Sequence, residues 1–213
     1  MIRVLLADDH AIVRAGLKEL LTATGDIQVV GEATNGQDVL AAVRKGGFEV
    51  LVLDMSMPGR SGIELIKLVK AEQPKLRVLV LSMHSEKQYA VRAVKAGASG
   101  YLTKETAADE LVAAIRRVAG GGAYITPETA ERLVLDSSAD SGRALHSRLS
   151  DREFEVFRKL VAGRSVTDIG HELNLSVKTI STHKSRIMEK MALSSQAELV
   201  RYALENDLLD DTA

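Results

Sequence analysis

Four side chains that could bind a cation and a phosphoryl group each follow a short apolar run. Asp8 and Asp9 come after VLLA, Asp54 after VLVL, and Lys104 after GYLT. If these runs are strands of an open parallel sheet, their carboxyl ends gather at one edge, where such folds bind ligands. Three carboxylates form a hard oxygen site suited to Mg²⁺, and a lysine beside them suits a phosphoryl group.

Five strand-like runs alternate with five helix-like segments from residue 1 to about residue 120. The strand-like runs are 2–7, 27–33, 50–53, 77–81 and 99–102. The helix-like segments are 11–23, 36–45, 62–72, 86–96 and 107–119. Nearly all-apolar strands separated by helices indicate a parallel sheet covered on both faces. We therefore predict an α/β doubly wound, flavodoxin-like domain with five parallel strands, which places the ligand site beside the first strand.

A second domain is expected because 213 residues exceed the usual single-domain size of roughly 100 to 150. We assign 1–120 to the first domain and 121–145 to a linker with a possible short helix at 127–135. Residues 146–213 show no strand signal and are predicted to form a small all-α four-helix domain. Its helices are expected at 151–162, 166–173, 177–191 and 196–206. Only three residues join the second and third of these helices, which is typical of a helix-turn-helix.

The composition excludes several classes of protein. The chain has no cysteine, so disulfides, thiolate-bound metals and thiol nucleophiles are excluded. Its apolar runs are far shorter than the ~20 residues of a membrane-spanning helix, and no signal-peptide pattern opens the chain. We therefore expect a cytoplasmic protein with no membrane partner.

The net charge of −1 conceals an uneven distribution. Residues 176–190 carry four basic side chains and one acid, whereas 204–213 carry four acids and no base. A phosphate backbone responds to such a local basic stripe rather than to the total charge. Nucleic acid therefore remains a candidate partner.

The segment 177–191 has two dissimilar faces if it is helical. Val177, Ile180, Ile187 and Met191 have the spacing of one buried face. Lys178, Ser181, Thr182 and Ser185 lie opposite, and short hydroxyl side chains beside lysine suit a DNA major groove. The alternative is a helical tail that serves only for dimerisation. His183 is left open between a phosphate contact and packing.

The acidic residues alone are weak evidence, because acids at strand ends often only cap helices or face solvent. Their combination with Ser82 and Lys104 is more specific, and residues 1–120 resemble a response-regulator receiver domain. The resemblance implies that Asp54 is the phosphoacceptor and that Asp8, Asp9, Asp54 and the Ser56 carbonyl hold Mg²⁺. It also implies that Ser82 and Lys104 contact the phosphoryl oxygens, and that Ser82 and Tyr101 form the switch pair. From its spacing alone, Tyr101 could equally be an ordinary edge residue.

The segment 149–191 resembles the LuxR-type helix-turn-helix. The motif LSDRE stands at the start of the domain, AGRS before the first motif helix, and LSVKTISTH in the recognition helix. With a receiver in front, the whole chain resembles the NarL/FixJ subfamily of two-component response regulators. The DNA-contact residues expected from the resemblance and the helix faces are Lys178, Thr179, Ser181, Thr182, Lys184 and Ser185.

The resemblance predicts a DNA-binding transcription regulator that a sensor histidine kinase switches by Mg²⁺-dependent phosphorylation of Asp54. It would not be an enzyme beyond catalysing its own phosphorylation and dephosphorylation. A homodimer on DNA is expected, with Val200 and Ala203 as part of its contact, and RNA polymerase is a possible partner. Two alternatives remain: a constitutive DNA binder whose receiver is only a dimerisation scaffold, and a Mg²⁺-dependent phosphatase. The phosphatase would require an acid where Ser56 stands.

Overall fold

The structure is a computed structural model of the 213-residue chain. It describes all residues except 58–61, 83–86, 106–107, 139–143, 207 and 210–213. The chain divides into two compact units, Met1–Arg132 and Leu133–Ala213. Each unit is described below by itself.

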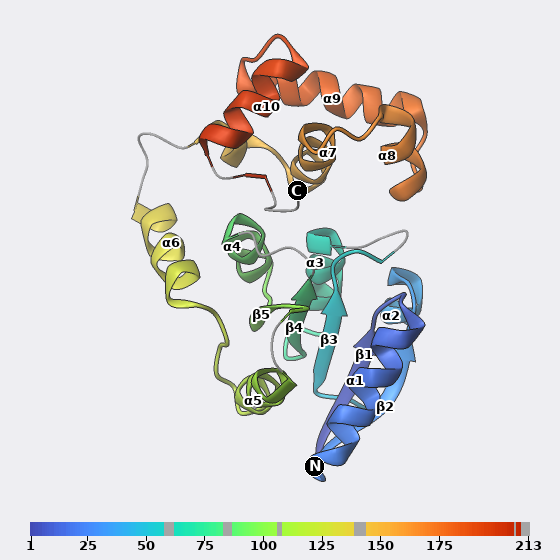
Figure 1. Ribbon diagram of the computed structural model, residues 1–213. Helices are drawn as coiled ribbons and strands as arrows, with labels where there is room; N and C mark the ends of the chain where they lie inside the picture. Colours follow the sequence, from blue (N-terminus) through green and yellow to red (C-terminus); the bar gives the residue numbers. More distant parts are fainter. Residues whose placement is uncertain (58–61, 83–86, 106–107, 139–143, 207, 210–213) are drawn as a thin grey trace. The chain divides into compact units, whose positions relative to one another are not determined.

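The first unit is built on a five-stranded, all-parallel sheet with strand order β2-β1-β3-β4-β5 (Figure 1). The strands are β1 Ile2–Ala7, β2 Ile27–Ala33, β3 Val50–Asp54, β4 Arg77–Ser82 and β5 Gly100–Thr103. The helices between and after them are α1 Ala11–Ala23, α2 Gly36–Lys45, α3 Gly62–Glu72, α4 Lys87–Lys95 and α5 Ala108–Ala119. The predicted doubly wound fold is confirmed, with most boundaries within one residue of the expected ones.

Two apolar cores lie on opposite faces of this sheet because successive side chains of a strand point to opposite sides. On β1, Leu5 belongs to the core under α2, α3 and α4, whereas Val4 and Leu6 belong to the core under α1 and α5. The central strand β3 is buried along its whole length. Burial on both faces explains why the strands are nearly all-apolar in sequence, and it leaves the strand ends as the place for polar side chains.

The outer edge of β5 is covered by the chain that leaves α5. The Tyr101 N–H donates to the Tyr124 carbonyl at 3.0 Å, and the Tyr124 N–H donates to the Ser99 carbonyl at 2.9 Å. Gly100 permits this close approach, since a Cβ there would lie 2.8 Å from the Tyr124 carbonyl oxygen. The path toward helix α6, Pro127–Ser138, is thus hydrogen-bonded to the strand that precedes Lys104.

Beyond α6, the second unit consists of a short 3₁₀ turn, η1 Leu145–Arg148, and four α-helices. These are α7 Asp151–Val161, α8 Val166–Glu172, α9 Val177–Met191 and α10 Gln196–Glu205. Each helix begins after a serine whose side chain accepts an N–H of the first turn, and the Ser150–Glu153 pair forms a complete capping box. The core centres on Phe154, Phe157 and Ile180. In the described part of the chain, no helix is long and apolar enough to cross a membrane.

Candidate functional site

The carboxyl edge of the sheet brings together Asp8, Asp54 and Lys104. Asp8 directly follows β1, Asp54 ends β3, and Lys104 directly follows β5. Lys104 Nζ lies 2.8 Å from Asp54 Oδ2 and 2.7 Å from Asp8 Oδ2, and all three side chains are at least nine-tenths buried. The Lys104 ammonium therefore pairs with two buried carboxylates. The positions of the strand ends predict that these three side chains lie together.

The pKa values of this group reflect competition between burial and pairing. Burial raises the pKa of Asp54, and hydrogen bonds from Lys104 and from the Ser56 N–H, at 3.0 Å, oppose the rise without cancelling it. Burial also disfavours the Lys104 ammonium, but its bonds to Asp54 and Asp8 outweigh burial and raise its pKa. A cation beside the carboxylates would favour the ionised, nucleophilic form of Asp54.

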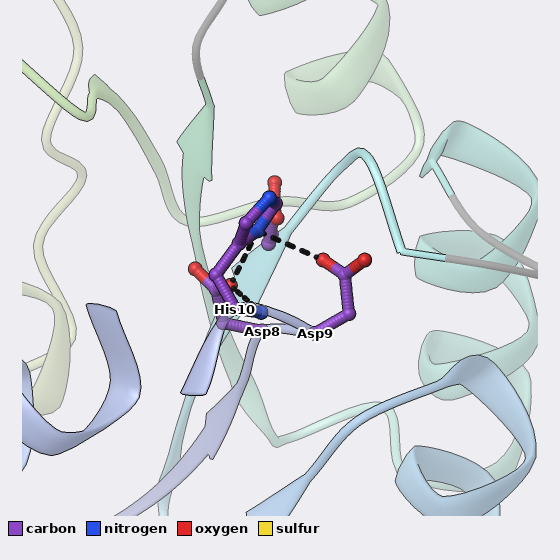
Figure 2. Close-up of side chains that lie close together, drawn as sticks. Asp8, Asp9 and His10 are labelled. Atoms are coloured by element: carbon purple, nitrogen blue, oxygen red, sulfur yellow. Dashed lines mark hydrogen bonds and ion pairs between the residues drawn. The ribbon is translucent and has the colours of Figure 1, made fainter. Parts of the chain in front are cut away.

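Asp9 and His10 complete a cluster that fits a divalent cation. Ligand atoms of Asp8, Asp9, His10 and Asp54 all lie within 4.8 Å of one another. Figure 2 shows His10 Nδ1 facing both neighbouring carboxylates, 3.2 Å from Asp8 Oδ1 and 3.1 Å from Asp9 Oδ1. Asp8 Oδ2 is buried without an aligned hydrogen bond from the described residues, although Lys104 lies at ion-pair distance. Mostly oxygen ligands, one of them a buried carboxylate oxygen without an aligned hydrogen-bond donor, suit a hard cation.

Ser82 and Tyr101, the predicted switch residues, are both buried. Ser82 ends β4, and its carbonyl accepts the Lys104 N–H at 2.7 Å, which fixes the backbone of the lysine against the neighbouring strand. Tyr101 lies in the core under α4 and its backbone is paired with Tyr124. Neither His10 nor Tyr124 was predicted to belong to the site, although His10 directly follows the Asp8–Asp9 pair.

In the second unit, α8 and α9 are joined by a tight turn of the helix-turn-helix kind. Asn174 adopts the left-handed conformation at φ 52°, and the Leu175 N–H donates to the Gly170 carbonyl at 2.8 Å. A Cβ on Gly170 would lie only 2.9 Å from the Leu175 carbonyl oxygen, so glycine suits this close approach. Ser176 then caps α9 by accepting the Thr179 N–H at 3.0 Å.

Helix α9 has a buried face and an exposed face, with one correction to the prediction. Ile180, Ile187 and Met191 are fully buried. Val177, which was predicted to join them, is 48% exposed, so that assignment is wrong. Val177 is the first residue of α9, and its Cβ points toward the helix N-terminus, where no preceding turn of the helix covers it.

The six predicted DNA-contact residues fall into two groups. Four of them are exposed: Lys178, Ser181, Thr182 and Ser185. Thr179 and Lys184 are half-buried and bond within the domain. The Thr179 hydroxyl lies 2.7 Å from the Ser176 hydroxyl, and Lys184 Nζ donates to Gln196 Oε1 at 2.9 Å. The exposed group thus offers a continuous polar surface on α9.

His183 and Ala203 are less exposed than residues that contact DNA or a second subunit would be. His183 is half-buried, and burial lowers its pKa, with Arg152 and Arg186 adding to the effect. Its environment therefore favours the neutral ring.

Ala203 is fully buried within its own domain, so the expectation that it forms part of a dimer contact is wrong. On α10 the exposed large apolar residue is instead Leu204, which is 61% exposed.

Comparisons with known proteins match a family to each of the two units. Residues 4–116 match the response regulator receiver domain, and residues 147–203 match the family of bacterial regulatory proteins called luxR. The chain is 37% identical over 210 residues to the response regulator GacA of Pseudomonas protegens, covering 99% of both chains. It is 41% identical over 202 residues to the transcriptional regulatory protein UhpA of Escherichia coli, covering 94% of this chain and 97% of UhpA.

A solved structure extends the similarity to three dimensions. It is that of RcsB from Salmonella enterica serovar Typhimurium bound to promoter rprA in the presence of the phosphomimetic BeF₃⁻. This chain aligns with a TM-score of 0.66 and 31% identity, covering 94% of this chain and 97% of RcsB. A receiver followed by a LuxR-type helix-turn-helix defines one class of protein, the two-component response regulators that regulate transcription. This chain belongs to that family, in its NarL/FixJ branch.

Proposed function

We propose that phosphorylation of Asp54 by a sensor histidine kinase controls binding of α9 to double-stranded DNA. The observation that carries this proposal is the contact of Lys104 Nζ with both Asp54 and Asp8 inside a buried acidic cluster. Such a cluster has the parts that phosphoryl transfer requires, namely a carboxylate nucleophile, a cation site and a lysine for the transferred charge. The chain would catalyse only its own phosphorylation and dephosphorylation.

In the proposed transfer, one Asp54 oxygen forms a bond to phosphorus as the P–N bond to the kinase histidine breaks. Lys104 offsets negative charge on the transferring group, and the Ser82 hydroxyl donates to a phosphoryl oxygen. Asp8, Asp9 and Asp54, with the Ser56 carbonyl, would hold Mg²⁺, which lowers the repulsion between donor and acceptor oxygens when bound. Rearrangement of Ser82 and Tyr101 would then favour one pre-existing arrangement of the receiver.

For the DNA-binding unit, we propose that the exposed face of α9 enters a major groove. Lys178 would contact a phosphate, whereas Ser181, Thr182 and Ser185 would face base edges. Thr179 and Lys184 remain candidates that must release their internal partners to reach DNA. A homodimer on an inverted or direct DNA repeat is expected. Its candidate contact on α10 consists of Val200 and the exposed Leu204, in place of the buried Ala203.

The domain limits that follow are 1–120 for the receiver, 121–145 for the linker that contains α6, and 146–213 for the DNA-binding domain. The matched family segments at 4–116 and 147–203 support this division. The cytoplasm, where a kinase and genomic DNA are both accessible, is the proposed location, and RNA polymerase is a proposed partner.

The proposal is tested by the intact mass of the full chain after incubation with acetyl phosphate. Wild type should gain one phosphate with Mg²⁺ and none with EDTA, and Asp54→Asn should gain none. Hydrolysis of p-nitrophenyl phosphate through many turnovers would instead support the phosphatase alternative. A wild-type chain that neither acetyl phosphate nor a phosphorylated kinase domain can label would contradict the proposal.

A further inference from the structure

The hydroxyl groups on the exposed face of α9 are partly committed to the helix itself. Thr182 Oγ1 donates to the Lys178 carbonyl at 3.0 Å, and Ser185 Oγ donates to the Ser181 carbonyl at 3.1 Å. A hydroxyl whose hydrogen is used in this way presents only acceptor lone pairs outward. These two side chains therefore suit base edges that offer donors, which are the exocyclic amino groups of adenine and cytosine.

Val177 adds an apolar group to the same surface. Positions 177, 181 and 185 are spaced four apart, so Val177, Ser181 and Ser185 form one row along α9. Val177 is 48% exposed, whereas the apolar residues Ile180, Ile187 and Met191 of the same helix are fully buried. Packing against the described residues thus leaves about half of this branched apolar residue accessible to a partner. It also stands beside the exposed cationic Lys178.

We propose that Val177 is a specificity-determining residue that contacts the 5-methyl group of a thymine in each half-site. This inference rests on the proposed DNA-binding function of α9. N-terminal residues of a recognition helix are the ones that reach base edges, and Val177 is the first residue of α9. The thymine methyl is the apolar group that base edges present in the major groove, so it is the chemical partner of an exposed valine.

The row as a whole then favours an A·T pair at Val177 and an adenine or cytosine at the positions that face the hydroxyl oxygens. Val177 meets thymine, and an acceptor oxygen on Ser185 or Thr182 meets an amino group. Guanine offers only acceptors in the major groove, so it leaves such oxygens facing other acceptors. Lys178 holds a phosphate and contributes affinity without reading sequence.

The test uses thymine-to-uracil replacement, which removes the methyl group and leaves the base pair otherwise unchanged. A binding site is first obtained by in vitro selection with the full chain in the presence of acetyl phosphate and Mg²⁺. Each thymine is then replaced singly by uracil, and binding is measured by fluorescence anisotropy. We expect one position in each half-site where uracil weakens wild-type binding about fourfold, the effect of losing one buried methyl group.

Two variants separate a base contact from a general effect. Val177→Ala should bind the thymine site more weakly than wild type and lose no further affinity on uracil. Lys178→Ala, the matched control, should bind more weakly yet keep the full uracil effect. Uracil sensitivity that persists in Val177→Ala, or its absence in wild type at every position, would overturn the inference while leaving the proposed function intact. If phosphorylated wild type selects no DNA sequence at all, both this inference and the proposed DNA-binding function are contradicted.

Discussion

The two candidate sites of this chain achieve their chemistry in opposite ways. At the carboxyl edge of the sheet, Asp8, Asp54 and Lys104 are buried and paired within 3 Å, so each side chain depends on its neighbours. On α9, Lys178, Ser181 and Val177 are exposed, and the helix backbone alone sets their positions. A buried ionic site fixes a reaction type because a change in any member leaves a charge uncompensated. An exposed row of side chains determines only a preference among DNA sequences, because solvent can replace each contact.

This difference predicts that single substitutions at the sheet edge have the largest effects. Lys104→Met removes the shared ammonium and leaves two buried carboxylates facing each other. We expect phosphorylation by acetyl phosphate to slow by about 10²-fold or more, the range seen when one charge-stabilising group is removed. The initial rate of phosphate incorporation, followed by intact mass, measures it.

Lys18→Met is the matched control, since Lys18 is an exposed lysine of the same unit that pairs with Glu32 on the surface. It should react at the wild-type rate. Equal rates for Lys104→Met and wild type would show that the buried ion pair is structural, and the contrast between the two sites would lose its basis.

An ion pair with a buried carboxylate in the DNA-binding unit tests whether burial, rather than the receiver chemistry, produces large effects. The Glu153 carboxylate is buried, accepts the Ser150 N–H at 2.8 Å and lies 2.6 Å from Lys190 Nζ. We expect Glu153→Gln to lower the free energy of unfolding by ~2 kcal/mol at pH 7, as for other hydrogen bonds to charged groups. Thermal unfolding followed by circular dichroism measures the loss.

The same pair predicts a pH dependence with a definite sign. Burial alone would raise the pKa of Glu153, but the Lys190 and Ser150 bonds outweigh it, so the pKa lies below the usual 4.5. The unfolded chain therefore takes up the proton first as pH falls. The stabilisation is complete well above pH 4.5 and is lost as pH drops through the lower, folded value. Wild type and Glu153→Gln should converge in stability once pH falls below the folded value, whereas Glu189→Gln, at an exposed position, should match wild type.

Lysines on α9 are expected to show smaller effects of two distinct kinds. Lys178→Ala should weaken binding to all DNA sequences about equally and lower the slope of log affinity against log salt by ~1. Lys184→Ala should change that slope less, because its ammonium is held by Gln196, and should lower the thermal midpoint instead. Ser185→Ala should change the preferred sequence. Salt titrations of DNA binding distinguish these results, and equal slopes for the two lysine variants would show that Lys184 also reaches a phosphate.

Prediction from sequence succeeded where topology alone determines position. The residues after β1, β3 and β5 must meet at one edge of a parallel sheet, so Asp8, Asp54 and Lys104 could be placed together without coordinates. The helix limits of the second unit could be predicted for a similar local reason. Ser150, Ser165, Ser176 and Ser195 each mark a helix start through a hydrogen bond within the next three residues.

Prediction from sequence failed where the burial or the partner of a side chain depends on contacts with other parts of the domain. Helical spacing assigned Val177 to the buried face, but spacing does not show that burial begins only at Ile180, one turn into α9. Ala203 was expected at a surface and is buried. The partner of Lys184, Gln196, lies on another helix, and nothing in the local sequence indicates that contact.

The central claim is that the state of Asp54 controls the DNA affinity of α9. The most direct measurement is the dissociation constant of the full chain for a selected DNA site, with acetyl phosphate and Mg²⁺ and without them, for wild type and Asp54→Asn. The account predicts at least about tenfold tighter binding for phosphorylated wild type, a typical coupling between sites, and no change for Asp54→Asn. Wild type that carries phosphate on Asp54 by mass and binds DNA with unchanged affinity would contradict it.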